Sequence, residues 1–177
     1  MAAIGKEDFE AAYRYGKNLP SLPQRALVFD KLARAFESKK EIGRAMGIIS
    51  EVAQEIGKAG DGLDKARAML IVADAAARLD PNLGFEVTKP AVEAINRADA
   101  GQKSNRTPSQ AGFDLSTLKF DQGFPLLARY DFERTLLLAQ EIEKKEASVL
   151  VQLALCRAAL IKPREPQPES KGKAKTQ

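Results

Sequence analysis

The chain has 177 residues, of which 44% are hydrophobic and 29% are charged, and its formal net charge at pH 7 is +4. This length and balance suit one globular domain or a short repeat array with a continuous core, and an Ala- and Leu-rich composition favours helix. Because the chain contains no histidine, Ser-His-Asp catalysis, Cys-His catalysis and imidazole metal sites are excluded.

The charge is unevenly distributed, since half of the net charge lies in residues 163–177 and residues 1–162 are nearly neutral. A nearly neutral body lacks the basic stripe that phosphate binding needs, so nucleic-acid contact should be weak at most and confined to the tail. The N-terminal segment has no apolar core of signal-peptide length, and no run approaches the roughly 18 apolar residues of a membrane span. We therefore expect a cytoplasmic protein without a membrane partner, unless a leader has been removed from a longer chain.

The first helix is expected over residues 6–19, because Pro20 ends it. The second should cover residues 21–37, where Ser21 and Gln24 have the spacing of a capping box. These two helices would form the first hairpin.

A second pair of helices should follow. Ser38 and Glu41 repeat the capping-box spacing, and residues 41–59 show the cleanest amphipathic pattern of the chain. The glycine-rich turn after this helix matches neither dinucleotide nor phosphate-loop spacing, so we interpret it as a helix-terminating turn. Asp61 would cap the next helix, which ends at Leu79.

A fifth helix is expected from Asp80 to Ala98, with Asp80 as its cap and Pro90 kinking it or dividing it in two. Residues 99–123 then form an insertion that begins with a long polar loop. The apolar residues that close the insertion alternate partly like an extended segment. A short helix over residues 124–130 should follow.

The most legible pattern is the hairpin over residues 131–161, whose arms are joined by a charged turn at residues 144–146. Asp131 is placed to cap its first arm. The second arm is apolar over most of its circumference, so we expect it to be buried between neighbours, with Cys156 as an inert packing thiol. Residues 163–177 lack large apolar side chains and should form a flexible basic tail.

The hairpins show a weak internal repeat. Residues 8–36 align without a gap on residues 131–159 at a shift of 123, which is three times 41, and small side chains recur at that period at Ala12, Ala53, Ala94 and Thr135. The alternative is that an Ala-rich helical chain aligns with itself by chance. The repeat predicts an all-α fold of stacked antiparallel hairpins over residues 1–162.

This spacing of helix pairs, with small residues at crossing points and apolar second helices, resembles the helical-hairpin repeats of HEAT-like and tetratricopeptide-like α-solenoids, in an uncharacterised bacterial member. The tetratricopeptide and ankyrin motifs themselves are absent. The resemblance implies a non-catalytic interaction or scaffold module that presents a surface to an unknown protein partner.

The candidate interaction surface is the insertion with the edge of the short helix, namely Phe113, Leu115, Leu118, Phe120, Phe124, Arg129 and Tyr130. The alternative is that these side chains fold back and cap the array. No catalytic, metal or cofactor site is predicted. A second functional hypothesis is a small-ligand binder or enzyme that uses carboxylates and Arg129 beside the insertion. The apolar second arm of the last hairpin also suggests self-association or a longer solenoid.

Overall fold

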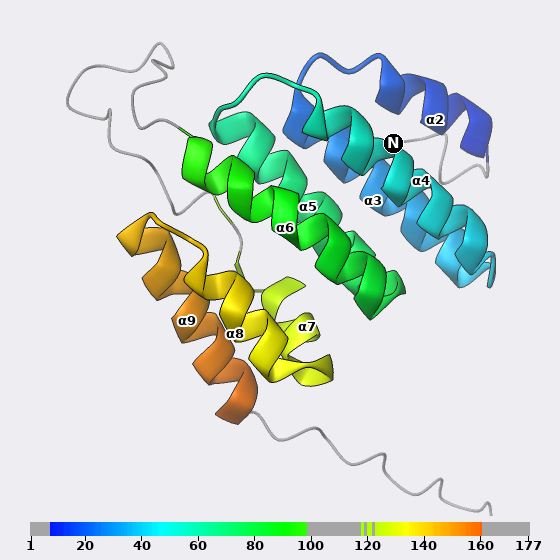
Figure 1. Ribbon diagram of the computed structural model, residues 1–177. Coiled ribbons are helices and arrows are strands. Elements are labelled where there is room, and N and C mark those ends of the chain that lie inside the picture. The colour runs from blue at the N-terminus through cyan, green and yellow to red at the C-terminus, as the bar shows by residue number, and fades with distance from the viewer. Residues whose placement is uncertain (1–7, 99–117, 119, 122, 161–177) are drawn as a thin grey trace, which may run out of the picture.

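The computed structural model describes residues 8–98, 118, 120, 121 and 123–160, and the secondary structure in these ranges is entirely helical (Figure 1). The all-α prediction is therefore confirmed for the described part of the chain. The helices are α2 (Phe9–Lys17), α3 (Leu22–Ser38), α4 (Ile42–Gly57), α5 (Leu63–Leu79), α6 (Pro81–Arg97), α7 (Gly123–Tyr130), α8 (Phe132–Gln140) and α9 (Lys145–Leu160).

Two of the predicted helix caps are confirmed. The side chain of Asp80 accepts a hydrogen bond from the backbone N–H of Leu83 at 2.9 Å, and Asp131 accepts one from Arg134 at 3.0 Å. Each bond satisfies a backbone donor that has no partner within the first helical turn. Both helices consequently begin where the sequence indicates.

The other predicted caps differ in outcome, and only that of Ser38 is wrong. Ser21 occupies the cap position of α3 without a side-chain hydrogen bond, and Ser38 is the last residue of α3, where its hydroxyl donates to the carbonyl of Ala35 at 2.7 Å. Asp61 accepts from the ammonium of Lys65 at 3.0 Å, and Gly62 is the cap residue of α5. The carbonyl of Ala35 thus competes for the Ser38 hydroxyl that the motif assigns to the start of the next helix.

Pro90 does not divide the fifth helix, since α6 runs unbroken through it. Val87, Ala91 and Val92 beside the proline are buried, so packing on both sides holds the turn together. Tertiary contacts thereby outweigh the hydrogen bond that proline cannot donate.

The helices pack in two interleaved series. Each helix touches the next one along the chain, and alternate helices also touch, as α3 with α5, α5 with α7 and α7 with α9 on one side, and α4 with α6 and α6 with α8 on the other. Figure 1 shows α5 and α6 side by side through the middle of the molecule, and α3 packs against α5.

The closest approach joins α5 and α6. A side-chain carbon added to Gly84 of α6 would lie 2.6 Å from the Cα of Ala77 on α5, so glycine is required for these two backbones to meet. Phe85, Leu127 and Leu138 form a small buried cluster with Ala77 at this contact, and a larger cluster that includes Ile49 and Met69 forms the main core. No helix in the described ranges has the length and apolarity to cross a membrane.

The second arm of the last hairpin departs from expectation. The buried residues of α9 are Ala147, Val151, Leu155 and Ala158, while Cys156 is exposed. The helix packs on α7 and α8, which cover one of its faces. The predictions of an all-round buried arm and a buried thiol are therefore wrong, because apolar composition buries a helix face only where a neighbour exists.

The predicted insertion is only partly visible. Phe113, Leu115 and the polar loop lie outside the described residues, and so does the tail at residues 163–177. Leu118 and Phe120 are both buried, at 5% exposure. The end of the insertion thus contributes to the core.

Candidate functional site: a groove between α2 and α4

The predicted interaction surface does not form one exposed patch. Leu118, Phe120 and Phe124 are buried, and the rings of the two phenylalanines lie 6.4 Å apart in the core. Arg129 and Tyr130 are exposed at the end of α7. The described part of the insertion therefore adopts the alternative arrangement, in which its apolar side chains fold back on the helices.

The described helices form a groove at a distance in sequence from the predicted surface. It lies between α2 and α4 above α3 and has a volume of about 380 Å³. It is lined by Phe9, Glu10, Tyr13, Leu32, Phe36, Arg44, Gly47, Ile48 and Glu51. The size falls within the range of sites that hold a small molecule or the anchoring side chains of a peptide.

The floor of the groove is apolar and rigid. Leu32 and Phe36 of α3 are 1% and 2% exposed, so their positions are fixed by the core. The ring of Phe9 on α2 packs on Phe36 at 4.8 Å, and Tyr13 meets Phe29 edge to face at 5.5 Å. Such aromatic pairs hold the wall of the groove in place and offer apolar area to a ligand.

Glycine keeps the α4 side of the groove open. A side-chain carbon added at Gly43 or Gly47 would meet no atom within 4 Å, so neither position is crowded. The two residues are four apart and therefore lie on one face of α4. Of the two, Gly47 lines the groove, and its lack of a side chain leaves the α4 backbone accessible there to a close-packing ligand.

A cluster of partly exposed charged side chains joins α2 to α4. The Tyr13 hydroxyl donates to Glu51 at 2.6 Å, and the Lys17 ammonium donates to Glu51 at 2.7 Å and also to Glu55. The hydrogen bond to Glu51 raises the pKa of Tyr13, and the bond from Lys17 lowers the pKa of Glu51. Bonds to Glu51 and Glu55 likewise raise the pKa of Lys17. These shifts favour a charged Lys17, a charged Glu51 and a neutral Tyr13 at neutral pH, and we interpret the cluster as a tie between the two helices.

Two cations lie over aromatic rings beside the groove. The Arg44 guanidinium is 4.2 Å from the Phe36 ring centroid, and the Lys39 ammonium is 4.7 Å from that of Phe9. Cation–π contacts of this kind hold a charge close to an apolar surface. The groove therefore combines an apolar floor with charges of both signs, from Arg44 and from Glu10 and Glu51.

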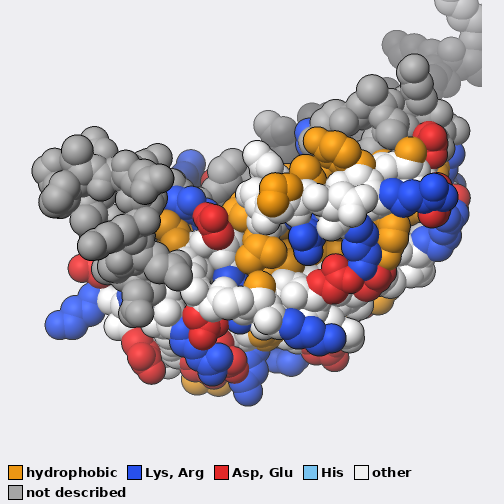
Figure 2. Space-filling view, turned by 90° about the horizontal axis from the view of Figure 1, so that it is seen from above, with side chains coloured by type: hydrophobic (Ala, Val, Ile, Leu, Met, Phe, Trp, Pro, Cys, Tyr) orange, Lys and Arg blue, Asp and Glu red, His pale blue; other side chains and the backbone are white. Residues whose placement is uncertain are grey.

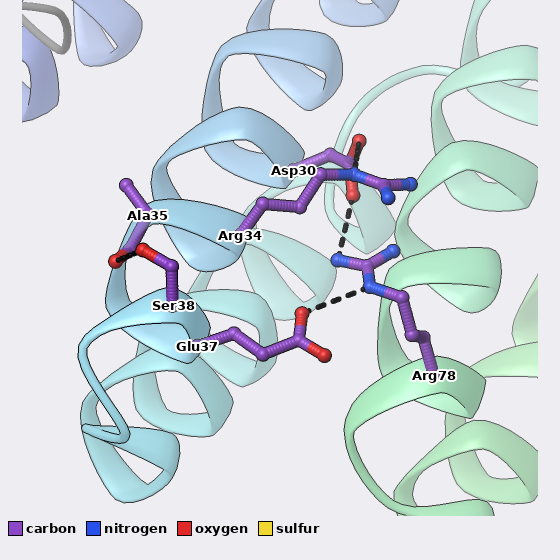
Figure 3. A network of polar contacts seen from close by, with 6 residues as sticks. All are labelled: Asp30, Arg34, Ala35, Glu37, Ser38 and Arg78. Carbon is purple, nitrogen blue, oxygen red and sulfur yellow. Dashed lines mark hydrogen bonds and ion pairs between the residues drawn. The ribbon is translucent and has the colours of Figure 1, made fainter. Parts of the chain in front are cut away.

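A second polar cluster joins α3 to α5 (Figure 3). Arg78 donates to Asp30 at 3.0 Å and to Glu37 at 3.1 Å, and Arg34 donates to the other oxygen of Asp30 at 3.0 Å. Asp74, one turn before Arg78, is partly buried, and desolvation raises its pKa to about 6. We interpret the cluster as a structural tie between the helices.

The described residues hold no other chemical centre. No group of three or more acidic or cysteine side chains within them is arranged to bind a metal ion. On the face seen in Figure 2, acidic and basic side chains intermingle among apolar ones. That face offers no basic stripe for nucleic acid.

Comparisons with protein-family models, with curated proteins and with solved structures found no match to this chain. A function is therefore inferred from the geometry of the groove. The groove is difficult to predict from the sequence because its lining residues come from three helices. Gly43 and Gly47, on an otherwise amphipathic helix, could have indicated an open helix face.

Proposed function

We propose that the chain is a non-catalytic protein-interaction module, built as a short array of stacked helical hairpins, that binds an amphipathic helix of another protein in the groove between α2 and α4. The observation that carries the proposal is the groove itself, with its apolar floor and its glycine-lined open side. Helix-in-groove recognition needs both features, because the ligand helix must bury an apolar face and approach closely.

The array is supported by the spacing of the helices. α3 and α5 each have 17 residues and begin 41 positions apart, at Leu22 and Leu63, and α9 begins a further 82 positions on, at Lys145. Contacts between alternate helices are those expected of stacked hairpins. α7 touches both α5 and α9, so it takes the place of the second helix of the third hairpin.

We expect the ligand helix to lie along the first turns of α4. α4 has 16 residues and α2 has nine, so the first turns of α4 extend past the start of α2 at Phe9. A ligand helix placed along these turns would contact Phe9, Arg44 and Ile48. Its apolar residues at three- and four-residue spacing would rest on Phe9 and Ile48, which are half-buried, and charged residues at its edges would face Arg44 and Glu51.

The test uses two matched glycine variants. Gly47→Trp fills the groove, whereas Gly57→Trp places the same side chain at the far end of α4, and both positions have free space around the added carbon. Peptides selected from a displayed library of amphipathic helices on the wild-type chain should bind the Gly57 variant unchanged and the Gly47 variant at least tenfold more weakly, by fluorescence polarisation. Peptides that bind both variants equally, or a failure to select any helix, would contradict the proposal.

A further inference from the structure

The exposed face of α9 carries an ordered stripe of apolar side chains. Val149, Leu153 and Leu160 are 53%, 60% and 84% exposed, and Cys156 between them is also exposed. The buried stripe of the same helix occupies the opposite face. α9 is therefore apolar on two sides and packed on one.

The corresponding positions of α5 carry mostly charged side chains. Counting back 82 residues from the stripe gives Arg67, Ile71, Asp74 and Arg78. In α5 all four are only partly buried, and Arg78 forms ion pairs with Asp30 and Glu37 of α3. Apolar side chains at the same positions of α9 indicate a surface that meets protein, since ordered exposed apolar patches mark interaction sites.

The spacing of the stripe points to its partner. The intervals between Val149, Leu153, Cys156 and Leu160 are four, three and four residues, a pattern that is unchanged when the helix direction is reversed. We propose that the stripe pairs with the same stripe of a second copy of this chain, in an antiparallel contact about a two-fold axis between Leu153 and Cys156. Val149 then lies opposite Leu160 of the partner subunit, and Leu153 opposite Cys156 of the partner subunit.

The charges beside the stripe are compatible with this register. The antiparallel arrangement puts Arg157 near Leu150 of the partner subunit, and Gln152 near Ala159 of the partner subunit, so no like charges meet across the flanks. A two-fold interface requires this kind of self-complementarity. The two copies of Arg157 lie on opposite sides of the axis.

A head-to-tail stack of copies has no matching surface. α3 is at the other end of the series α3, α5, α7 and α9, and it exposes Gln24, Lys31 and Arg34 around a single large apolar residue, Leu27. Packing the apolar stripe of α9 on that face would desolvate the charges of Lys31 and Arg34 against apolar side chains. The stripe therefore fits its own copy better than it fits the other end, and the contact closes as a dimer.

The size of the stripe determines the expected affinity of the dimer. A specific interface buries at least about 1,000 Å² over both partners, and one helix face per copy stands near that lower limit. We expect a reversible dimer with a dissociation constant on the order of micromolar. This surface is separate from the groove of α2 and α4, so its failure would not affect the proposed function.

The first test is sedimentation equilibrium of the full chain between about 1 and about 100 μM, a range that brackets micromolar affinity. The average mass of the wild type should rise from 19.3 kDa towards twice that value. Leu153→Glu should weaken dimerisation at least tenfold with unchanged circular dichroism, because Leu153 is mostly exposed, and Gln152→Glu should behave as the wild type. A wild type that stays monomeric, or a Leu153→Glu variant that dimerises normally, would overturn the proposal.

The second test fixes the direction of the helices. Leu153→Cys places a thiol opposite Cys156 of the partner subunit, so mild oxidation should join two chains within minutes. Gln152→Cys, on the same helix but off the stripe, should cross-link no faster than the wild type. Equal cross-linking of both variants, or faster cross-linking through Cys156 alone, would contradict the antiparallel register.

Discussion

α5 and α9 are helices of nearly equal length and corresponding position, yet they bury very different surfaces. α5 has ten buried residues, most of them alanine, whereas α9 has four, although it contains as many large apolar side chains. α5 is enclosed by α3, α4, α6 and α7, whereas among the described helices α9 packs on α7 and α8. Burial in this fold is thus decided by the number of neighbouring helices, and composition shows only which faces are able to accept one.

The largest expected effect is the difference in stability between truncating a side chain of α5 and truncating one of α9. Met69→Ala in α5 should lower the free energy of unfolding by about 2 to 5 kcal/mol, because Met69 is 1% exposed and the substitution leaves a cavity. Leu153→Ala in α9 should change the stability of the monomer by less than about 0.5 kcal/mol. Urea unfolding of both variants at low protein concentration checks this difference, and similar losses would refute it.

A second pair of variants compares the stability effects of an added methyl group on a packed helix face and on an open one. Gly84→Ala should destabilise the fold by about 1 to 3 kcal/mol, because the added carbon meets the Ala77 backbone. Gly47→Ala meets no atom and should stabilise by about 0.5 to 1 kcal/mol through the higher helix propensity of alanine. Thermal unfolding should show melting temperatures that move in opposite directions, and movement in the same direction would show that one site is misplaced.

The third prediction concerns the charged outer face of α5. Desolvation raises the pKa of Asp74 from 3.8 to about 6, with Asp30 and Asp121 adding to the rise and Arg78 and Arg34 opposing it. The folded state therefore binds the proton more tightly than the unfolded state, and the resulting stability is present below about pH 4 and lost as pH rises through about 6.

Asp74→Asn should remove this pH dependence and stabilise the fold at pH 7 by about 1 kcal/mol, a figure reduced for the partial exposure of the carboxyl. Urea unfolding at pH 4, 5, 6 and 7 measures it. The wild type should lose stability relative to the variant across this series, and parallel curves would contradict the assignment. Ser50→Asn, on the separate helix α4, serves as the control for a change to asparagine.

The sequence predicts the helices well because their boundaries depend on local features. Proline and aspartate at the start of α6, and aspartate before α8, mark helix starts through backbone chemistry that needs no tertiary context. The predicted cap at Ser38 is wrong, because its hydroxyl donates to the carbonyl of Ala35 within α3. The unbroken course of α6 at Pro90 likewise depends on neighbours that a single segment does not reveal.

The candidate site was less predictable than the fold. The groove depends on the different lengths of α2 and α4, and on Leu32 and Phe36 reaching its floor from α3. The apolar residues at the end of the insertion suggested a surface, but Leu118 and Phe120 are buried because they supply core that α7 alone is too short to provide. Periodicity identifies an apolar face without showing which element covers it.

Hydrogen–deuterium exchange of the full chain at about 1 and about 100 μM tests most directly the claim that neighbouring helices determine burial. Amides of α5 should be strongly protected at both concentrations, because its neighbours belong to the same chain. Amides of α9 should exchange much faster than those of α5 in the dilute sample and become protected in the concentrated one. Equal protection of α5 and α9 in the dilute sample would contradict the account.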